Sequence, residues 1–154
     1  MPLATPGTMT SQRDSGSGRS VEVVIPSDTV EARRVQDEIE QRLKEYRYGE
    51  RDIFSIRLAL EEALVNAIKH GNQLDRNKSV RIHYRVLADR FDIRITDEGT
   101  GFDPSDVPDP TAVENLERPC GRGLMLMRHY MTEVVFHGGG NSVSMSKILS
   151  NGQT

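Results

Sequence analysis

The most regular hydrophobic pattern of the chain lies between Asp52 and His70, where it predicts one long helix. Apolar side chains recur on one wide face, at the spacing of a helix that packs on a core. The members of this face are Ile53, Ile56, Leu60, Ala63, Leu64 and Ala67. The opposite side is also apolar and consists of Phe54, Leu58 and Val65, with Ile68 on its flank. The pattern predicts a helix that is buried on two sides and that ends with Gly71 at the C′ position.

Two narrow polar edges separate these apolar sides. Arg57 and Glu61 share one edge at the i,i+4 spacing of a surface ion pair, so we interpret Glu61 as a partner of Arg57 rather than as a catalytic group. The other edge, called the polar stripe below, lines up Glu62, Asn66, Lys69 and His70. Burial of an unpaired polar group costs about 2–7 kcal/mol, so a helix covered on both sides needs a partner for this stripe. The stripe therefore predicts a polar ligand.

The rest of the chain predicts an antiparallel sheet beside this helix. The expected strands are 20–26, 79–86, 91–96, 132–137 and 142–149. Apolar and polar residues alternate in the second and third of these, which is typical of a sheet covered on one side only. A helix capped by Ser27 or Asp28 is expected to reach Tyr46, and Gly121-Arg122-Gly123 is expected to open a helix at 124–131.

The strand at 91–96 is followed by an acidic residue in phase with its core face. Asp97 continues the alternation that begins at Phe91, which places a carboxylate in the covered layer. The alternative is that the strand ends there and Asp97 caps a turn. The sequence Glu98-Gly99-Thr100-Gly101 follows at once, and the irregular segment from Phe102 to Cys120 has a length typical of a lid.

Composition and charge limit the classes of function. The 154 residues suit one domain, and 20 Lys and Arg stand against 23 Asp and Glu without a basic cluster, so nucleic acid is not expected as a partner. Neither an apolar run of about 18 residues nor a signal-peptide core occurs, so no membrane span is expected. The Ser-, Gly-, Thr- and Pro-rich segment 1–19 predicts a disordered tail, with the folded domain at 20–149 and a short tail at 150–154. The single Cys120 suits the cytoplasm.

Three side chains of these elements suit the same ligand. The Asn66 amide oxygen is a hard, neutral ligand for a Mg²⁺ ion that takes most of its negative charge from phosphates. Glu62, one turn earlier, is placed to accept a proton from an attacking hydroxyl. Asp97 can accept a hydrogen bond from the exocyclic amine of adenine.

Four glycines add a backbone contribution. Gly99 and Gly101 allow the backbone to approach a flat ring. Gly121 and Gly123 offer N–H groups at a helix N-terminus, which is a phosphate site. Each signal is weak by itself, but their order and spacing together favour a nucleotide site.

The chain resembles the GHKL ATPase superfamily in three motifs that correspond to its N, G1 and G2 boxes. They are Glu62-Ala-Leu-Val-Asn66-Ala-Ile-Lys69-His70-Gly71, Asp97-Glu98-Gly99-Thr100-Gly101-Phe102 and Gly121-Arg122-Gly123-Leu124. The short lid is similar to that of the anti-sigma factor serine kinases of bacterial partner-switching systems. The resemblance covers residues 20–149 and implies the Bergerat ATP-binding fold. This is an α+β, two-layer α/β sandwich with a mostly antiparallel mixed sheet of about five strands and helices on one face.

The resemblance also implies a role for each matching position. Asn66 would ligate the Mg²⁺ that bridges the ATP phosphates, Glu62 would be the catalytic base, and Asp97 would bind the adenine amino group. The positions implied to shape the base pocket or contact phosphates are Gly99, Gly101, Lys69, His70, Gly121, Arg122, Gly123 and Leu124. Arg118 resembles a lid arginine that reaches the γ-phosphate, although one extra residue separates it from the glycines.

By the same resemblance, the chain would be an ATP-binding anti-sigma factor and serine/threonine-protein kinase. It would phosphorylate a serine of an anti-sigma-factor antagonist, bind a sigma factor, and form a homodimer. One alternative is a catalytically silent, nucleotide-gated module that sequesters a regulatory partner. A second is a detached histidine-kinase catalytic domain, which the lack of a preceding helical hairpin with a phosphorylatable histidine disfavours.

Overall fold

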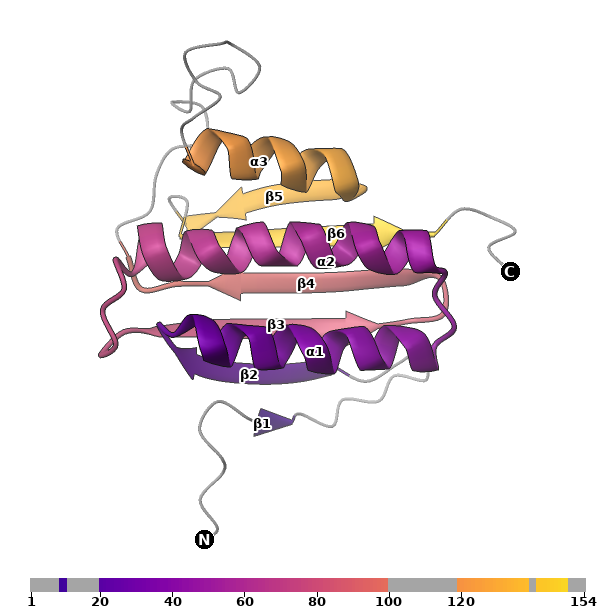
Figure 1. Cartoon of the computed structure of the whole chain (residues 1–154), viewed down its shortest axis with the longest axis horizontal. Coiled ribbons are helices and arrows are strands. Elements are labelled where there is room, and N and C mark those ends of the chain that lie inside the picture. The colour runs from indigo at the N-terminus through magenta and orange to yellow at the C-terminus, as the bar shows by residue number, and fades with distance from the viewer. Residues whose placement is uncertain (1–8, 11–19, 100–118, 139–140, 150–154) are drawn as a thin grey trace, which may run out of the picture.

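An antiparallel sheet is the frame of the computed structural model, which describes residues 9–10, 20–99, 119–138 and 141–149 (Figure 1). The strand order is β1-β2-β3-β4-β6-β5, and each neighbouring pair is antiparallel. The strands are β1 (Met9–Thr10), β2 (Ser20–Pro26), β3 (Ser79–Val86), β4 (Arg90–Thr96), β5 (Glu133–His137) and β6 (Ser142–Ile148). The helical segments are α1 (Thr29–Glu45), α2 (Glu50–Val65), the π-helix η1 (Asn66–Gly71) and α3 (Pro119–Tyr130).

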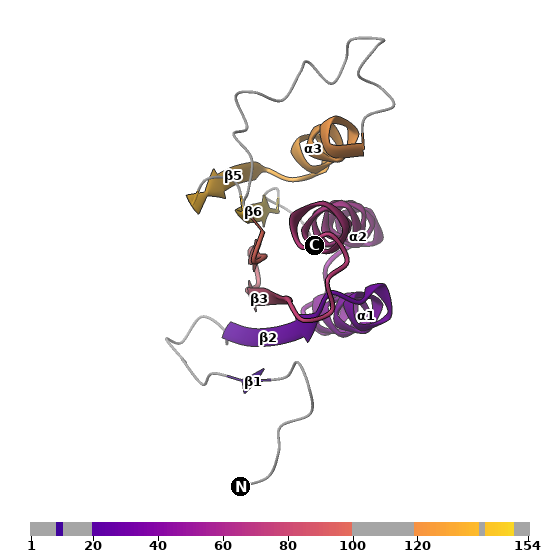
Figure 2. The same cartoon turned by 90° about the vertical axis from the view of Figure 1, so that its left-hand side faces the viewer.

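The three α-helices lie on the same side of the sheet, as Figure 2 shows. This arrangement confirms the predicted α+β fold with helices on one face. Two details differ from the prediction. The sheet is antiparallel throughout its described strands rather than mixed, and β1 adds a strand within the segment expected to be a disordered tail. Met9 pairs with Glu22 and Thr10 with Val21, because the edge of β2 otherwise presents unpaired backbone groups.

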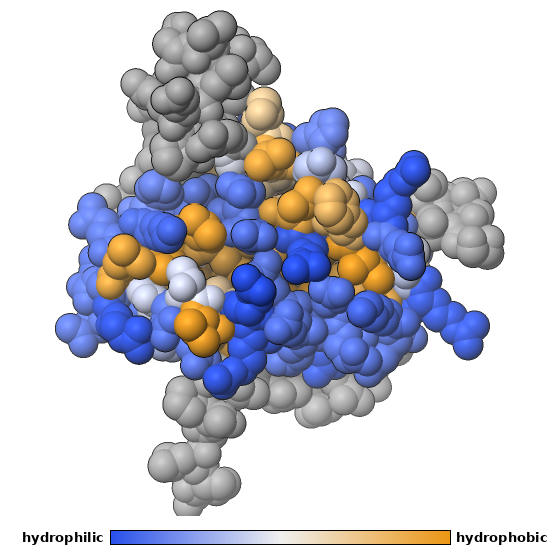
Figure 3. Space-filling view, in the orientation of Figure 1, coloured by the Kyte–Doolittle hydropathy of each residue, from blue (hydrophilic) through white to orange (hydrophobic). Residues whose placement is uncertain are grey.

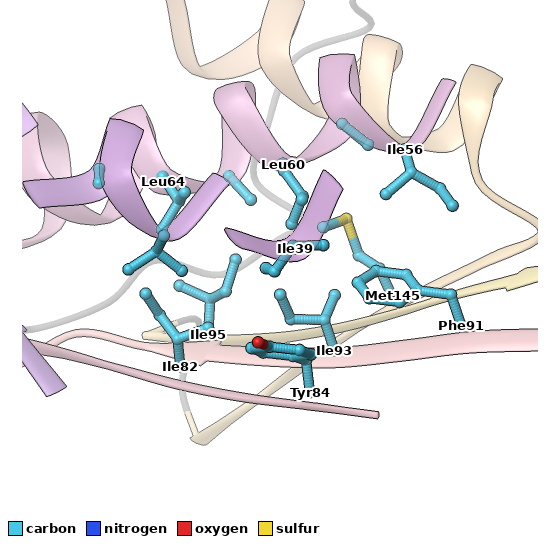
Figure 4. Packing of buried hydrophobic residues seen from close by; sticks show 14 of the residues in the cluster. Ile39, Ile56, Leu60, Leu64, Ile82, Tyr84, Phe91, Ile93, Ile95 and Met145 are labelled. Carbon is cyan, nitrogen blue, oxygen red and sulfur yellow. The ribbon is translucent and has the colours of Figure 1, made fainter. Parts of the chain in front are cut away.

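The hydrophobic core fills the space between the sheet and the helices α1 and α2 (Figure 4). Alternate residues of β3 and β4 point into it, and each is at most 4% exposed. These residues are Val80, Ile82, Tyr84, Val86, Phe91, Ile93 and Ile95. Ile39 of α1 and Leu60 of α2 cover them from the helix layer. Full burial of one such side chain stabilises the fold by about 1.5–3 kcal/mol, so the alternation predicted from sequence determines which face of the sheet is covered.

The two apolar sides of α2 differ in burial. The predicted wide face is buried along its whole length, as expected. On the opposite side Ile68 is completely buried, whereas Phe54 is 55% exposed and makes an edge-to-face contact with Tyr130 of α3. The polar edge of Arg57 also differs from the prediction, because its guanidinium Nη1 lies 3.9 Å from Oε1 of Glu40 on α1 rather than pairing with Glu61.

The end of the long helix differs from the predicted C-cap. The α-helical hydrogen bonding stops at Val65, and Asn66–Gly71 continue as one wider turn of π-helix. The N–H of Asn72 closes this turn on the carbonyl of Ala67 at 2.8 Å, five residues earlier. Gly71 therefore belongs to the helical segment, and its φ is not positive. Single π-turns inside helices occur often at functional sites.

Two other helix ends refine the sequence predictions. Asp28, and not Ser27, caps α1, because its Oδ1 accepts the N–H of Val30 at 2.9 Å. The helix α3 begins at Pro119, earlier than expected, so Gly121 and Gly123 lie inside its first turns rather than before it. Pro is favoured at the first helical position, because its fixed φ suits the helix and it lacks an N–H that would be unpaired there.

The outer surface of the helix layer is largely hydrophilic, with separate hydrophobic residues (Figure 3). Large apolar side chains that remain exposed include those of Val30, Phe54 and Leu74. Within the part of the chain that the structure describes, no helix combines the length and the apolar character needed to cross a membrane.

Candidate functional site

The Asp97 side chain lies against the end of the long helix. It follows β4 in the predicted phase, and its backbone is held to the start of β6 by two hydrogen bonds. The Asp97 N–H donates to the Asn141 carbonyl at 2.9 Å, and the Asn141 amide Nδ2 donates to the Asp97 carbonyl at 3.2 Å. A methyl group on Gly71 would overlap the Asp97 carboxyl group. The prediction that this carboxylate enters the covered layer is thus confirmed.

The alternative reading of Asp97 as a turn cap is also correct. Its Oδ1 accepts the N–H of Gly99 at 2.7 Å, which closes an Asx-type turn. Burial raises the pKa of the Asp97 carboxyl above its ordinary value, against the Gly99 N–H and the positive charge of Lys78, which both lower it. A further hydrogen-bond donor would therefore stabilise the charged form of this half-buried carboxylate.

Gly71 and Gly99 bring two backbone segments into direct contact. A Cβ atom on Gly99 would overlap the carbonyl group of Gly71 and would lie 3.0 Å from Oδ1 of Asp97. Both glycines are therefore required by close approach rather than by an unusual φ. The result is a carboxylate beside backbone that carries no side chains, which fits a flat base with an exocyclic amine.

A second glycine contact joins α3 to the polar stripe. The Cβ position of Gly123 lies 3.0 Å from Oε1 of Glu62 and 3.1 Å from Nδ2 of Asn66. Both polar side chains are half-buried, whereas the neighbouring Glu61 is exposed. The structure thus assembles the N and G2 motifs, which lie far apart in the sequence, and it separates the two adjacent glutamates as predicted.

The remaining predicted site residues fall into three groups. Lys69 and His70 are exposed and belong to η1, and Leu124 is buried at 4% exposure in α3. Gly121 and Arg122 lie in the first turns of α3. Gly101 and Arg118 lie outside the described residues.

Asn72 is a buried polar residue next to Gly71 that the sequence pattern did not indicate. It is completely buried directly after η1, and its Oδ1 accepts the Glu98 N–H at 2.8 Å. Its Nδ2 donates to Ser27 Oγ at 2.9 Å and to the Ser79 carbonyl at 3.0 Å. The next two residues, Gln73 and Leu74, both have positive φ, which is uncommon for residues with a side chain. An Asn after a helix end is usually read as a cap or turn residue, so its sequence position alone carries no sign of these contacts.

The residues present fit a magnesium nucleotide. The described residues contain no group of three or more His, Cys, Asp or Glu that would hold a metal by itself. The stripe instead offers one carboxamide and one carboxylate, which suits a Mg²⁺ that keeps waters and shares phosphate oxygens. The half-buried Asp97 and the contact of Gly71 with Gly99 suit the base.

Several known proteins resemble this chain in sequence or in fold. The 35% identical serine-protein kinase RsbW of Bacillus licheniformis aligns over 67% of this chain and 69% of its own length. RsbW of Staphylococcus aureus (strain JH9) is 33% identical over 66% of this chain and 69% of its own length. A crystal structure of the RsbU and RsbW domains of Rv1364c from Mycobacterium tuberculosis shares the fold, with a TM-score of 0.57 and 17% identity. The match covers 84% of this chain and 32% of that one. Residues 25–147 match the family described as histidine kinase-like ATPase domain, and the chain belongs to this family.

Proposed function

We propose that this chain is a serine-protein kinase and anti-sigma factor of the RsbW type, which uses ATP to phosphorylate a serine of an anti-sigma-factor antagonist. The observation that carries the proposal is the contact of Gly123 with Glu62 and Asn66. This contact supports the proposal because it brings a carboxylate and a Mg²⁺-suited carboxamide next to the first turns of α3, and the N-terminus of a helix favours phosphate binding. The RsbW relatives, at 33–35% identity, support the same activity.

Each residue has a distinct task in this proposal. Bound MgATP supplies the phosphoryl group. Glu62 accepts the proton of the serine hydroxyl as its oxygen attacks, and Asn66 is a ligand of Mg²⁺. Asp97 accepts a hydrogen bond from the adenine amine. The residues proposed to line the base or hold phosphates are Gly99, Gly101, Lys69, His70, Arg118, Gly121, Arg122, Gly123 and Leu124.

The proposal also includes the partners. A sigma factor is the second protein partner, and release of that factor follows when the unphosphorylated antagonist binds instead. A homodimer and a cytoplasmic location belong to the same proposal, and the single cysteine of the sequence suits the cytoplasm.

Transfer of labelled phosphate tests the function. We expect incubation with γ-labelled ATP, Mg²⁺ and the antagonist protein encoded nearby to yield phosphoserine on the antagonist. Glu62→Gln should abolish the transfer and retain ATP binding, because the amide cannot accept the proton. Glu61→Gln is the matched control, since this exposed neighbour lies on the other edge of α2, and it should transfer at the wild-type rate. Nucleotide binding without transfer to any such antagonist would favour the nucleotide-gated binding module instead.

A further inference from the structure

Asn72 closes a ring of hydrogen bonds around the turn that carries Asp97. Its Oδ1 holds the N–H of Glu98, and the Glu98 carboxylate Oε2 accepts the Ser79 N–H at 2.7 Å. The Ser79 carbonyl then accepts from Asn72 Nδ2 at 3.0 Å, which completes the ring. Every hydrogen bond in this ring therefore restrains the residue directly after Asp97 or the strand beside it.

The ring is anchored to the rest of the fold. Asn72 Nδ2 also donates to Ser27 Oγ, and the Ser27 hydroxyl donates to the Lys78 carbonyl at 2.9 Å. The contacts of Asn72 thus connect η1 with the β2–α1 junction, the start of β3 and the end of β4. Because its amide uses both a donor and an acceptor function, no apolar residue of similar size can replace it.

The position of Asp97 depends on restraints from two sides. Asn141 holds its backbone from β6, and Asn72 holds the next peptide unit from the helix end. Between them, the carboxyl group lies against Gly71, the residue that directly precedes Asn72. A shift of Asn72 would therefore move both the Asp97 turn and the backbone on which its carboxylate rests.

We propose that Asn72 is a positioning residue for base recognition, which holds the Asp97 carboxylate where it accepts the adenine amine. The inference rests on the proposed function in so far as the ligand is ATP. Asn72 itself does not touch the base; it acts through Glu98 and Gly71. Its substitution should therefore change which base binds, and should affect the phosphoryl transfer step less.

Nucleotide selectivity tests this role, measured by calorimetric titration of the full chain with MgATP and with MgGTP. Asn72→Ala should weaken ATP binding about ten-fold or more, as expected when the hydrogen bond from the adenine amine to the Asp97 carboxylate is lost. GTP binding should weaken less. The ATP-to-GTP affinity ratio should therefore fall towards one. Loss of folding alone lowers the active fraction and leaves this ratio unchanged.

A milder variant covers the case in which Asn72→Ala does not fold. Glu98→Ala removes an exposed side chain and only the bond to the Ser79 N–H, so it should fold and lower the same ratio by a smaller factor. Tyr48→Phe is the matched control. It removes the buried bond from the Tyr48 hydroxyl to the Leu87 carbonyl near the other end of α2, and it should leave the ratio unchanged.

The outcomes separate the two proposals. A wild-type protein that prefers ATP, with Asn72→Ala and Glu98→Ala both retaining the full preference, overturns the role of Asn72. In that case the kinase proposal stands, because it depends on transfer to the antagonist. A wild-type protein that binds ATP selectively and shows the reduced ratio in the variants, but transfers no phosphate, supports the role of Asn72 and overturns the kinase activity. A wild type that binds neither nucleotide overturns both.

Discussion

The two ends of the continuous helix formed by α2 and η1 are connected to the sheet by different kinds of contact. Near the first end, the Tyr48 hydroxyl donates to the Leu87 carbonyl at 2.6 Å, and a Cβ atom on Gly49 would meet Asp52 Oδ2 at an ordinary van der Waals distance of 3.9 Å. At the second end, Gly71 contacts Asp97 and Gly99. The group that connects helix to sheet there is the buried side-chain amide of Asn72, in place of the Tyr48 hydroxyl.

A single hydrogen bond from Tyr48 connects the first end to the sheet. Connecting helix to sheet therefore does not by itself require close-packed glycines or a ring of hydrogen bonds such as that of Asn72. Burial raises the pKa of the Tyr48 hydroxyl, so this group remains a neutral donor. The second end excludes side chains and holds a carboxylate whose pKa burial raises. Burial therefore disfavours the charged form of Asp97 in the free protein, and a ligand that donates a hydrogen bond to the carboxylate would stabilise that form.

The largest effect is expected for Gly99→Ala. The new Cβ atom would overlap the Gly71 carbonyl, and two backbone segments must separate to admit it. We expect a loss of about 1–3 kcal/mol in the free energy of unfolding, together with loss of ATP binding. Urea unfolding and calorimetric titration measure the two effects. Wild-type stability of this variant would contradict the close contact between Gly71 and Gly99.

Gly71→Ala should affect binding more than stability. The added methyl group meets the Asp97 side chain, which can turn away, so the fold survives while the carboxylate leaves its position. We expect ATP affinity to fall about ten-fold or more. Gly49→Ala is the control at the first end and should leave ATP affinity unchanged, with a loss of about 0.5–1 kcal/mol in stability because Gly49 is the N-cap of α2 and Ala is a poor N-cap residue. Equal losses of affinity in both variants would remove the distinction between the ends.

Gly123→Ala should separate catalysis from stability. Ala is preferred to Gly inside a helix by about 1 kcal/mol, so α3 should be no less stable. Its methyl group would nevertheless lie 3.0 Å from Glu62 Oε1 and 3.1 Å from Asn66 Nδ2 and displace both. We expect the rate of phosphate transfer to fall by about ten- to a hundred-fold, because small misplacements of reacting groups slow a reaction by such factors. An unchanged rate in single-turnover kinetics would exclude this contact from the reaction.

Asp97→Asn should stabilise the nucleotide-free protein at neutral pH. Because the folded pKa of Asp97 is raised, the folded state binds the proton more tightly than the unfolded state. Stability is therefore lost as the pH rises from the ordinary pKa through the raised folded pKa. The Asn variant lacks this loss, so its melting temperature should exceed that of the wild type at about pH 7 and converge with it below about pH 4. ATP binding should weaken at the same time. A variant that melts lower at neutral pH would contradict the direction of the shift.

The smallest effect is expected for Arg57→Ala on the outer edge of α2. Its Nη1 lies 3.9 Å from Glu40 Oε1, and the Arg57 side chain is 55% exposed. We expect a change of less than about 0.5 kcal/mol in the free energy of unfolding, and none in ATP affinity or transfer. A change in transfer comparable to that of Glu62→Gln would mean that the polar edges of α2 have been assigned the wrong way round.

Local patterns predicted most of the frame. The strands at 20–26, 79–86 and 91–96 match β2, β3 and β4 within a residue, because alternation reports directly which side chains avoid water. The same periodicity placed Asp97 in the covered layer and separated Glu62 from Glu61. Those assignments needed only the geometry of one strand and one helix.

Contacts between distant segments required the tertiary structure. The hydrophobic pattern predicted that Gly71 ends the helix. In the structure, its small size is required because Asp97 and Gly99 lie directly against it. The pattern paired Arg57 with the nearest acid on its own helix, whereas Glu40 of α1 is the partner. The pattern gave no indication of the role of Asn72, because its hydrogen-bond partners come from three other parts of the chain.

The sequence by itself determined the elements, their buried faces and the position of the polar stripe, because hydrophobic periodicity depends only on neighbouring residues. Tertiary structure alone decided the π-turn, the start of α3 before its glycines, and the ring of hydrogen bonds behind Asp97. These features depend on how closely backbones from different elements approach, and such distances are set by packing of the whole core rather than by any local pattern.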